Sequence, residues 1–223
     1  MPAHIALKKG IALKMPDAGT QPRRWCAVLF KAALGCDFLK IYVFRHGETD
    51  WNAQHRIQGR TDIPLNENGV RQATDMGSHV AGKINPKYMI VSDLSRARDT
   101  GKIIAGFLGV DRIYTEHDLT ECSYGDMDGA IVEDIYTAVC PGEEPREDAS
   151  RRFLNVLKRY AEEYPEDFAV VSHGGTINAA LYTITGGKMG TGQTKLKNAC
   201  LSVLSYESGK FQIERCNLSP EEV

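Results

Sequence analysis

The apolar sequence Phe38-Leu39-Lys40-Ile41-Tyr42-Val43-Phe44 leads directly into Arg45-His46-Gly47-Glu48-Thr49. Such an apolar run is typical of a strand that is covered on both faces, as in a parallel sheet. Ligands bind these sheets just beyond the carboxyl ends of the strands, which is where His46 would lie. Arg45 offers a planar cation that can hold phosphate oxygens, and Gly47 lets the backbone approach an anion closely. The stretch therefore predicts a phosphate site at the sheet edge, with His46 as a candidate nucleophile.

Two later segments repeat the order of an apolar strand, a serine and a polar side chain at the start of a helix. Residues 88–91 are followed by Ser92-Asp93, and Arg96 lies in the first turn of the expected helix. Residues 168–171 are followed by Ser172-His173-Gly174-Gly175 and a second helical stretch. Because backbone N–H groups at a helix start also favour anions, we expect the three segments to converge on one phosphate.

A fourth segment, residues 119–129, is a loop in which Gly125 and Gly129 flank an acidic turn. Glu121 in this loop is the candidate acid. A glutamate in a glycine-rich loop is usually a solvated charge, because charged residues normally lie at the surface. Its assignment therefore depends on the other three segments.

Taken together, the four segments resemble the histidine phosphatase superfamily, in its phosphoglycerate-mutase-like branch. The resemblance extends over residues 38–206, and the motifs occur in the family's order. It is carried by these residues: Arg45-His46-Gly47-Glu48-Thr49, Trp51-Asn52, Gln58-Gly59, Asp62, Pro64-Leu65, Gly69, Gln72-Ala73, Ser92-Asp93-Leu94, Arg96-Ala97, Thr100, Leu119, Glu121, Gly125, Gly129 and Val171-Ser172-His173-Gly174-Gly175.

The resemblance implies a role for each reactive side chain. His46 would attack phosphorus and form a phosphohistidine that water then cleaves. Glu121 would give a proton to the leaving alkoxide and later take one from the attacking water. The catalytic set is completed by Arg45, Arg96 and His173, which would offset charge on the phosphoryl oxygens. The residues expected to bind substrate are Arg45, Asn52, Gln58, Gly59, Arg96 and Gly174. This chemistry requires no metal ion and no other cofactor.

Two departures from the family's pattern concern the substrate. Cys122 stands where mutases of this family usually have an arginine, and Arg60 stands where many members have tryptophan. The segment between Glu121 and His173 also lacks the long insertion that covers the mutase pocket, so water should reach the phosphoenzyme more easily. We therefore expect a phosphomonoesterase that acts on a small phosphorylated metabolite. A 2,3-bisphosphoglycerate-dependent phosphoglycerate mutase is the alternative, and a non-catalytic phospholigand-binding protein is a further one.

Length and composition indicate one catalytic domain, which we place at residues 38–223. The chain has 223 residues, of which 42% are hydrophobic and 25% charged, and these are ordinary fractions for a globular protein. Residues 1–40 carry a net charge of +5, so the remainder carries -7 against a total of -2. An acidic body argues against a nucleic-acid partner. Self-association into a homodimer is left open.

Residues 1–37 precede the part of the chain that resembles the family, and we expect an extension that is disordered or locally docked. Its basic composition resembles a transit peptide, and Arg23-Arg24 with the following apolar residues weakly resembles an export or lipoprotein signal. Lys31 interrupts that apolar stretch, which is too short for a membrane span. The six cysteines show no C-x-x-C spacing, so neither a zinc site nor a redox pair is indicated. We therefore expect a cytoplasmic protein with no membrane partner.

The remaining pattern predicts an α/β fold: a three-layer sandwich whose central sheet is mostly parallel, with helices on both faces. A closing hairpin is expected at the sheet edge, and residues 112–115 are a short strand candidate. Three helices are expected. The first is capped by Asn66 and carries the apolar residues Val70, Ala73, Met76 and Val80. The second is capped by Ser92 or Asp93 and carries Leu94, Ala97, Ile104 and Phe107, and the third begins at Pro145 and carries Phe153, Val156, Leu157, Tyr160 and Tyr164.

Overall fold

The computed structural model describes residues 38–133 and 140–223. The extension predicted for residues 1–37 lies outside the described residues. Six strands form one sheet in the order β3-β2-β4-β1-β5-β6. Their bounds are β1 Leu39–Arg45, β2 Met89–Ser92, β3 Ile113–Glu116, β4 Phe168–Ser172, β5 Leu201–Glu207 and β6 Lys210–Leu218.

The strand pairings confirm a mostly parallel sheet. Strand β4 lies between β1 and β2 and is parallel to both, and β3 is parallel to β2. Strand β5 runs antiparallel to β1 and continues into β6 through the predicted hairpin. The described part of the chain therefore has the α/β architecture that the sequence predicts.

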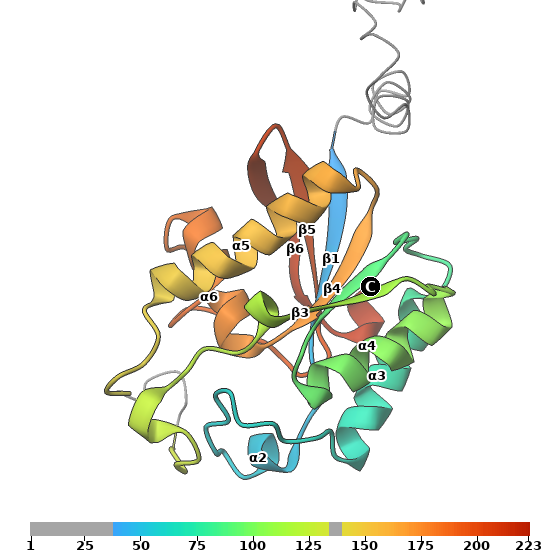
Figure 1. Cartoon of the computed structure of the whole chain (residues 1–223). Coiled ribbons are helices and arrows are strands. Elements are labelled where there is room, and N and C mark those ends of the chain that lie inside the picture. The colour runs from blue at the N-terminus through green and yellow to red at the C-terminus, as the bar shows by residue number, and fades with distance from the viewer. Residues whose placement is uncertain (1–37, 134–139) are drawn as a thin grey trace, which may run out of the picture. The chain divides into compact units, whose positions relative to one another are not determined.

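Helices cover both faces of this sheet, as Figure 1 shows. Helices α5 and α6 lie on one face, and α3 and α4 lie on the other. The helices are α2 Asp50–Ala53, α3 Glu67–Val80, α4 Ser95–Leu108, α5 Arg146–Glu163 and α6 Gly174–Thr185, with short 3-10 turns η1 His117–Leu119, η2 Gly125–Met127 and η3 Pro220–Glu222.

The central strand β1 contributes to both layers of the core. Ile41 and Val43 pack with residues of α5 and α6, whereas Tyr42 and Phe44 pack with residues of α3 and α4. Successive side chains of a strand point to opposite faces, so a strand between two helical layers must be apolar at nearly every position. This explains the continuous apolar run that precedes Arg45.

The predicted helices are present, with local corrections. Asn66 caps α3 by accepting a hydrogen bond from Gly69 N. Helix α4 begins after Leu94, without a side-chain cap, so the prediction that Ser92 or Asp93 caps it was wrong. Two of the apolar positions named for these helices, Val70 and Phe107, are each 44% exposed. The Phe107 ring packs against α3 at Gly77, where an added Cβ would lie 2.5 Å from its Cδ2.

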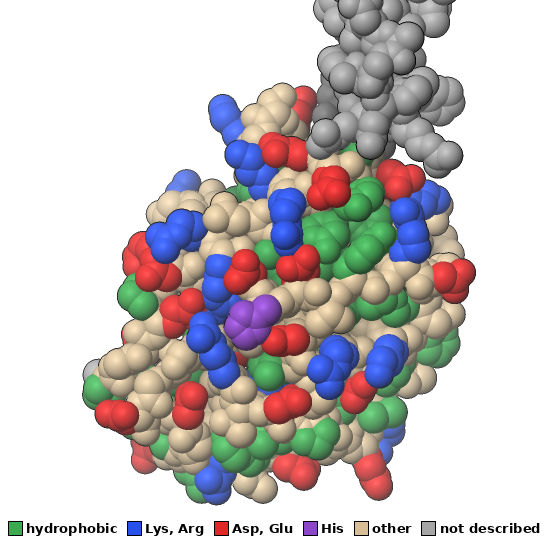
Figure 2. Space-filling view, viewed as in Figure 1, with side chains coloured by type: hydrophobic (Ala, Val, Ile, Leu, Met, Phe, Trp, Pro, Cys, Tyr) green, Lys and Arg blue, Asp and Glu red, His purple; other side chains and the backbone are tan. Residues whose placement is uncertain are grey.

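The edge strand β3 alternates between exposed and half-buried residues, as expected for a strand with one open side. Figure 2, viewed from this side, shows charged side chains of both signs spread over the surface and a hydrophobic area between them. Among the described residues, no helix is long and apolar enough to cross a bilayer.

The loop after β1 packs directly on the first turn of α3. A Cβ at Gly47 would lie 2.4 Å from Gly69 O, and a Cβ at Gly69 would lie 2.1 Å from Glu48 O. The Glu48 carbonyl also accepts a hydrogen bond from Asn66 N at 3.1 Å. Glycine is needed at both positions because two backbones meet there without room for a side chain.

We predict opposite effects of alanine at two helical glycines. Gly69→Ala should lower the free energy of unfolding by about 1–3 kcal/mol, because backbone atoms must move to admit the methyl group. Gly106→Ala in α4 is the control, since a Cβ there would meet no other part of the described molecule within 4 Å. That change should raise the free energy of unfolding by about 0.5–1 kcal/mol through helix propensity. Urea titration measures both, and a neutral Gly69→Ala would contradict the close packing.

Candidate active site

The parallel pairing of β1 with β4 brings two histidines together. Arg45 lies opposite Ser172 in this register, so His46 and His173 are the next residues of their strands. Their ring centroids are 5.1 Å apart, with the planes tilted by 54°. Both side chains are buried, with 2% and 0% exposed. The structure therefore places the two histidines of the sequence motifs side by side.

The His46 ring has one nitrogen fixed by the backbone. Its Nδ1 lies 2.6 Å from Gly47 O. A carbonyl oxygen can only accept, so Nδ1 carries the proton and Nε2 carries the lone pair. The pKa of His46 is held well below its ordinary value, chiefly by burial and further by the cations of Arg96 and Arg45. His46 is therefore a neutral imidazole with a lone pair on Nε2.

Two arginines extend from the surrounding elements to the histidines. Arg96 is completely buried in the first turn of α4 and donates to Thr61 O at 2.8 Å and Gly59 O at 2.9 Å. Burial is the main cause that lowers the pKa of Arg96 from its usual value. Arg45 donates to Leu196 O through one end of its guanidinium. Both side chains are thus held by backbone carbonyls and need no carboxylate partner for their position.

Three nitrogen atoms near the two histidines are buried and have no hydrogen-bond partner among the described residues, in addition to Asn178 Oδ1 in the cavity lining. They are the Nε atoms of Arg45 and Arg96 and the Nδ1 of His173. Buried polar groups are nearly always paired, so each such atom requires an explanation. An anion with several oxygens would satisfy groups that come from β1, α4 and the end of β4 at once.

Glu121 lies against the start of α6. Its Oε1 accepts from Cys122 N at 2.8 Å and Thr176 N at 2.9 Å, and its Oε2 accepts from Gly175 N at 3.1 Å. The helix N-terminus thus holds the carboxylate of Glu121, which suits the positive end of the helix dipole. The N–H groups of Gly175 and Thr176 therefore bind Glu121, and our expectation that the N–H groups of this helix start bind phosphate is not met for these two.

The start of α4 is occupied in the same way. Ser95 N donates to Asp62 Oδ1 at 2.7 Å, and Leu94 N donates to Ser92 Oγ at 3.3 Å. Carboxylate side chains of the chain itself therefore bind N–H groups at both helix starts, Ser95 N in α4 and Gly175 N and Thr176 N in α6. A bound anion would be held mainly by the side chains of the two arginines and the second histidine.

Glycines 174 and 175 allow these groups to approach one another. A Cβ at Gly175 would lie 2.4 Å from the Tyr124 hydroxyl and 2.8 Å from Glu121 Oε1. A Cβ at Gly174 would lie 3.2 Å from Arg45 Nε. The predicted substrate contact of Gly174 stays a prediction, but the structure gives it a clear role in making room for Arg45.

Asn52 and Gln58 are both tied to Thr49. Asn52 Oδ1 accepts from Thr49 N at 3.2 Å and from Asn198 Nδ2 at 3.3 Å. Gln58 Oε1 accepts from Thr49 Oγ1 at 3.0 Å. Substrate contacts of Asn52, Gln58 and Gly59 also stay predictions; what the structure adds for Gly59 is that its carbonyl holds Arg96.

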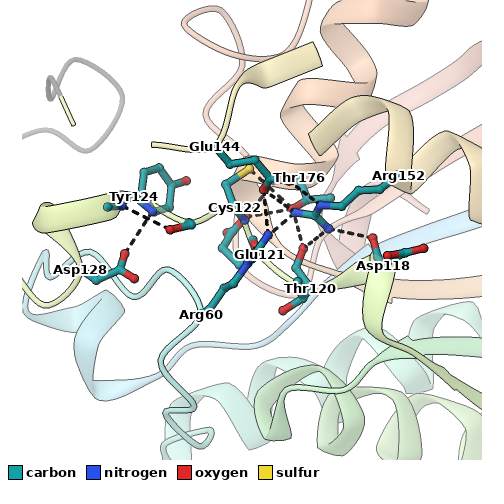
Figure 3. Close-up of polar contacts among 12 residues, drawn as sticks. Arg60, Asp118, Thr120, Glu121, Cys122, Tyr124, Asp128, Glu144, Arg152 and Thr176 are labelled. Carbon is teal, nitrogen blue, oxygen red and sulfur yellow. Dashed lines mark hydrogen bonds and ion pairs between the residues drawn. The ribbon is translucent and has the colours of Figure 1, made fainter. Parts of the chain in front are cut away.

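Arg152 on α5 holds the loop that carries Glu121, and sequence reasoning missed it because its helix is visible in the sequence only as a core stripe. Figure 3 shows its guanidinium between Thr176, Glu144 and the loop of residues 119–129 that carries Glu121, which we call the acid loop. It donates to Thr120 O at 2.7 Å and Glu121 O at 3.2 Å. Glu144 accepts from Arg152 through both carboxylate oxygens, each at 2.9 Å.

Arg60 is a second arginine that pairs with the Glu144 carboxylate. Its guanidinium donates to Glu144 Oε2 and to Glu121 O, each at 3.2 Å. The pKa of Glu144 is lowered by hydrogen bonding to Arg152 and by the charges of Arg152 and Arg60, which together outweigh burial. Both cations are therefore used to hold the acid loop.

A cavity of about 170 Å³ lies beside Arg45, Glu121 and the start of α6. Two carboxylates line it, Glu121 and Glu143, and Arg45 is its one cationic side chain among the described residues. The full lining is Arg45, Glu121, Tyr124, Cys140, Glu143, Gly174, Gly175, Asn178, Thr191 and Gly192. Within the described part of the chain, no group of three or more His, Cys, Asp or Glu side chains is placed to hold a metal ion.

We predict that the planar geometry of the Arg152 guanidinium contributes more to the stability of the protein than its positive charge does. Arg152→Lys keeps the charge but cannot serve the same acceptors, so the free energy of unfolding should fall by about 1–3 kcal/mol. The amides of Cys122 and Thr176, which donate to Glu121, should also exchange faster with deuterium.

The matched control is Arg151→Lys in the same helix. Arg151 has 66% of its side chain exposed and pairs with Asp148 at the surface, so its replacement should change stability by less than about 0.5 kcal/mol. Equal effects of the two changes would contradict a specific role of Arg152 in holding the acid loop.

Comparison with known proteins shows what the chain is similar to. One relative, an uncharacterized phosphatase PhoE of Bacillus subtilis (strain 168), is 35% identical over 184 residues, which cover 80% of this chain and 94% of the relative. The phosphoglycerate mutase-like protein 4 of Arabidopsis thaliana is 32% identical over 160 residues, with 64% and 70% covered. A solved structure of a mycobacterial glucosyl-3-phosphoglycerate phosphatase with VO3 has a TM-score of 0.71 and 25% identity, covering 81% of this chain and 100% of that chain.

The match to a family extends over nearly all of the described residues. The model of the histidine phosphatase superfamily (branch 1) matches residues 41–219, which include both histidines, both arginines and the acid loop. The resemblance stated from the motifs is confirmed, and the prediction of a histidine-type phosphatase is confirmed at the level of the family. The chain belongs to the histidine phosphatase superfamily, branch 1.

Proposed function

We propose that this protein is a phosphatase that hydrolyses small phosphomonoesters through a phosphohistidine on His46, without a metal ion. One observation carries the proposal: the lone pair of His46 Nε2 lies in a site where three buried polar atoms, on Arg45, Arg96 and His173, have no partner among the described residues. A nucleophile surrounded by groups that can hold phosphoryl oxygens is the arrangement that phosphoryl transfer needs.

In the first step His46 Nε2 attacks phosphorus while the bond from phosphorus to the ester oxygen breaks. Arg45 and Arg96 offset the charge on the phosphoryl oxygens as the transition state forms. The low pKa of His46 keeps the attacking ring neutral at physiological pH. Its remaining proton stays on Nδ1, bonded to the Gly47 carbonyl, which stabilises the positive charge that the ring gains.

Glu121 supplies the proton that the leaving alkoxide takes. Its Oε2 accepts only from Gly175 N among the described residues, whereas Oε1 accepts from two backbone amides. We therefore assign the transferable proton to Oε2. In the second step a water oxygen attacks phosphorus, the P–N bond breaks, and Glu121 takes the water proton, so that phosphate and the starting enzyme result.

The surroundings of Glu121 favour a phosphatase over the mutase. A mutase must grip a second acidic group of its substrate, which requires a cation beyond the phosphoryl site. Arg60 and Arg152 both pair with Glu144, and the cavity itself contains Glu143. Release of inorganic phosphate without 2,3-bisphosphoglycerate-stimulated exchange of 2- and 3-phosphoglycerate would support the phosphatase. The opposite result would support the mutase, and neither activity would favour a phospholigand-binding protein.

The cavity volume of about 170 Å³ fits a small phosphorylated metabolite as the partner. The net charge of -7 that follows residue 40 is the basis for proposing no nucleic-acid partner. A cytoplasmic location remains a proposal from the cysteine pattern. A screen of phosphorylated metabolites would identify the substrate class.

We predict that His46 carries the phosphoryl group during turnover. A reaction with labelled substrate, quenched at alkaline pH because the P–N bond is acid-labile, should give a label that maps to His46. His46→Ala should abolish labelling. Label that persists in this variant would assign the nucleophile elsewhere and refute the proposed mechanism.

We predict that the loss caused by Glu121→Gln depends on the leaving group. Alkyl phosphates leave as strongly basic alkoxides, so their single-turnover phosphorylation rate should fall on the order of 10²- to 10⁴-fold. Activated aryl phosphates should lose much less, because their leaving group needs little protonation. Single-turnover rates are required, because Glu121 also serves the hydrolysis step that all substrates share.

The amide of this variant places an NH2 group where a carboxylate oxygen now accepts from a backbone amide, so a general loss of stability is expected. The ratio between the two substrate types cancels that effect. Equal losses for both types would remove Glu121 from the role of acid.

A further inference from the structure

The serine at the end of β2 contacts the second histidine directly. Ser92 Oγ lies 2.8 Å from His173 Nε2, and both side chains are completely buried. The other ring nitrogen of His173, Nδ1, is also buried and has no partner among the described residues. Which nitrogen carries the proton decides whether Nδ1 acts as a hydrogen-bond donor or as an acceptor.

The hydrogen bonds of Ser92 Oγ determine the answer. Leu94 N donates to this oxygen at 3.3 Å, which uses one of its lone pairs. The hydroxyl has one proton, and two acceptors lie within reach: His173 Nε2 at 2.8 Å and Asp93 Oδ1 at 3.5 Å. Hydroxyl hydrogen bonds have donor–acceptor distances of about 2.5–3.0 Å, so only the contact with His173 is a good one.

The other oxygen of the competing Asp93 carboxylate is engaged by a histidine at the surface. Asp93 Oδ2 lies 2.6 Å from His117 Nδ1, in a pair at the surface. If Asp93 nevertheless took the hydroxyl proton, His173 Nε2 would have to donate to Ser92 Oγ. His173 Nδ1 would then present a buried lone pair, which repels phosphoryl oxygens.

We propose that Ser92 is a positioning residue that fixes His173 as the Nδ1–H tautomer and thereby makes it a neutral hydrogen-bond donor to the substrate. Only the identity of the acceptor, a phosphoryl oxygen, rests on the proposed function. The tautomer itself follows from the hydrogen bonds of Ser92.

Both histidines of the site then have the same tautomer and opposite tasks. The Gly47 carbonyl holds the proton of His46 on Nδ1 and leaves a lone pair on Nε2 for attack. The Ser92 hydroxyl occupies the lone pair of His173 on Nε2 and leaves the Nδ1 proton for binding. One backbone partner and one side-chain partner thus make one ring a nucleophile and the other a donor.

The tautomer can be read without an activity assay. Nitrogen-15 NMR of histidine-labelled protein at about pH 7.5, above the ordinary histidine pKa, distinguishes protonated from unprotonated ring nitrogens. We expect a protonated Nδ1 and an unprotonated Nε2 for His173. A protonated Nε2 with an unprotonated Nδ1, or protonation of both nitrogens, would overturn the proposal.

Variants test whether Ser92 is the cause. Ser92→Ala removes the donor, and His173 should then show a mixture of tautomers. Under the proposed function, kcat/KM should fall on the order of 10- to 100-fold, as expected when one preorganised donor is lost. Ser92→Cys keeps a weak donor of similar size and should be intermediate, which also covers the case that the alanine variant folds poorly. An unchanged His173 tautomer in both variants would overturn the role of Ser92.

Ser172→Ala is the matched control, because Ser172 is another completely buried serine at a neighbouring strand end. Its hydroxyl donates to Leu119 O at 2.7 Å and not to a histidine ring. The change should cost stability through the lost hydrogen bond but leave the His173 spectrum as in the wild type. A His173 tautomer that changes equally in this control would assign the effect to general loosening and overturn the role of Ser92.

Addition of inorganic phosphate tests the role of Ser92 and the proposed function separately. Its addition should shift the His173 Nδ1 resonance of the wild-type protein. A protein with the expected tautomer that shows no phosphate-dependent shift would retain the role of Ser92 and contradict the proposed function. A phosphate-dependent shift of His173 in a protein whose His173 is protonated on Nε2 would contradict the role of Ser92 but not the proposed function.

Discussion

The site depends first on the parallel pairing of β1 with β4. This register sets Arg45 opposite Ser172, so the two histidines that follow emerge at the same edge with ring centroids 5.1 Å apart. Strand β2 pairs with the other side of β4 and brings Ser92 to the same edge. A shift by one residue would move each side chain to the opposite face of the sheet. The reactive groups are therefore positioned by the hydrophobic core, which holds the register from both faces.

The second constraint is the control of charge at the edge of the sheet. Under the proposed function, a carboxylate and a phosphate share a small space, although their charges repel. The backbone amides at the start of α6 bind the Glu121 carboxylate, and the arginines near the histidines remain for the second anion. Arg152 and Arg60 hold the acid loop through carbonyl oxygens and Glu144. The division gives each anion its own donors, so that both can lie close to His46.

Much of the fold and the site could be predicted from the sequence, because reactive groups such as His46 follow directly after strands, and strand ends meet in a parallel fold. Prediction failed where a contact joins distant segments. Arg152 lies 31 residues after Glu121 in an amphipathic helix, and no local pattern distinguishes it from the exposed Arg151. Helical periodicity likewise places Phe107 on the apolar face of its helix, although it is 44% exposed. Periodicity gives a direction relative to one helix axis, but it does not tell where the adjacent helix lies.

The buried polar groups of the site explain why its first and second histidines cannot be exchanged. Burial is the main cause that lowers the pKa of both rings, so each is neutral, and a neutral imidazole has one donor and one acceptor nitrogen. The two rings differ in what their second nitrogen meets: a carbonyl, which can only accept, beside His46, and a hydroxyl, which can donate, beside His173. Under the proposed function, the same side chain thus acts as a nucleophile in one place and as a donor in the other. The chemistry of the site is decided by one backbone oxygen and one serine, each of which acts through the ring that it holds.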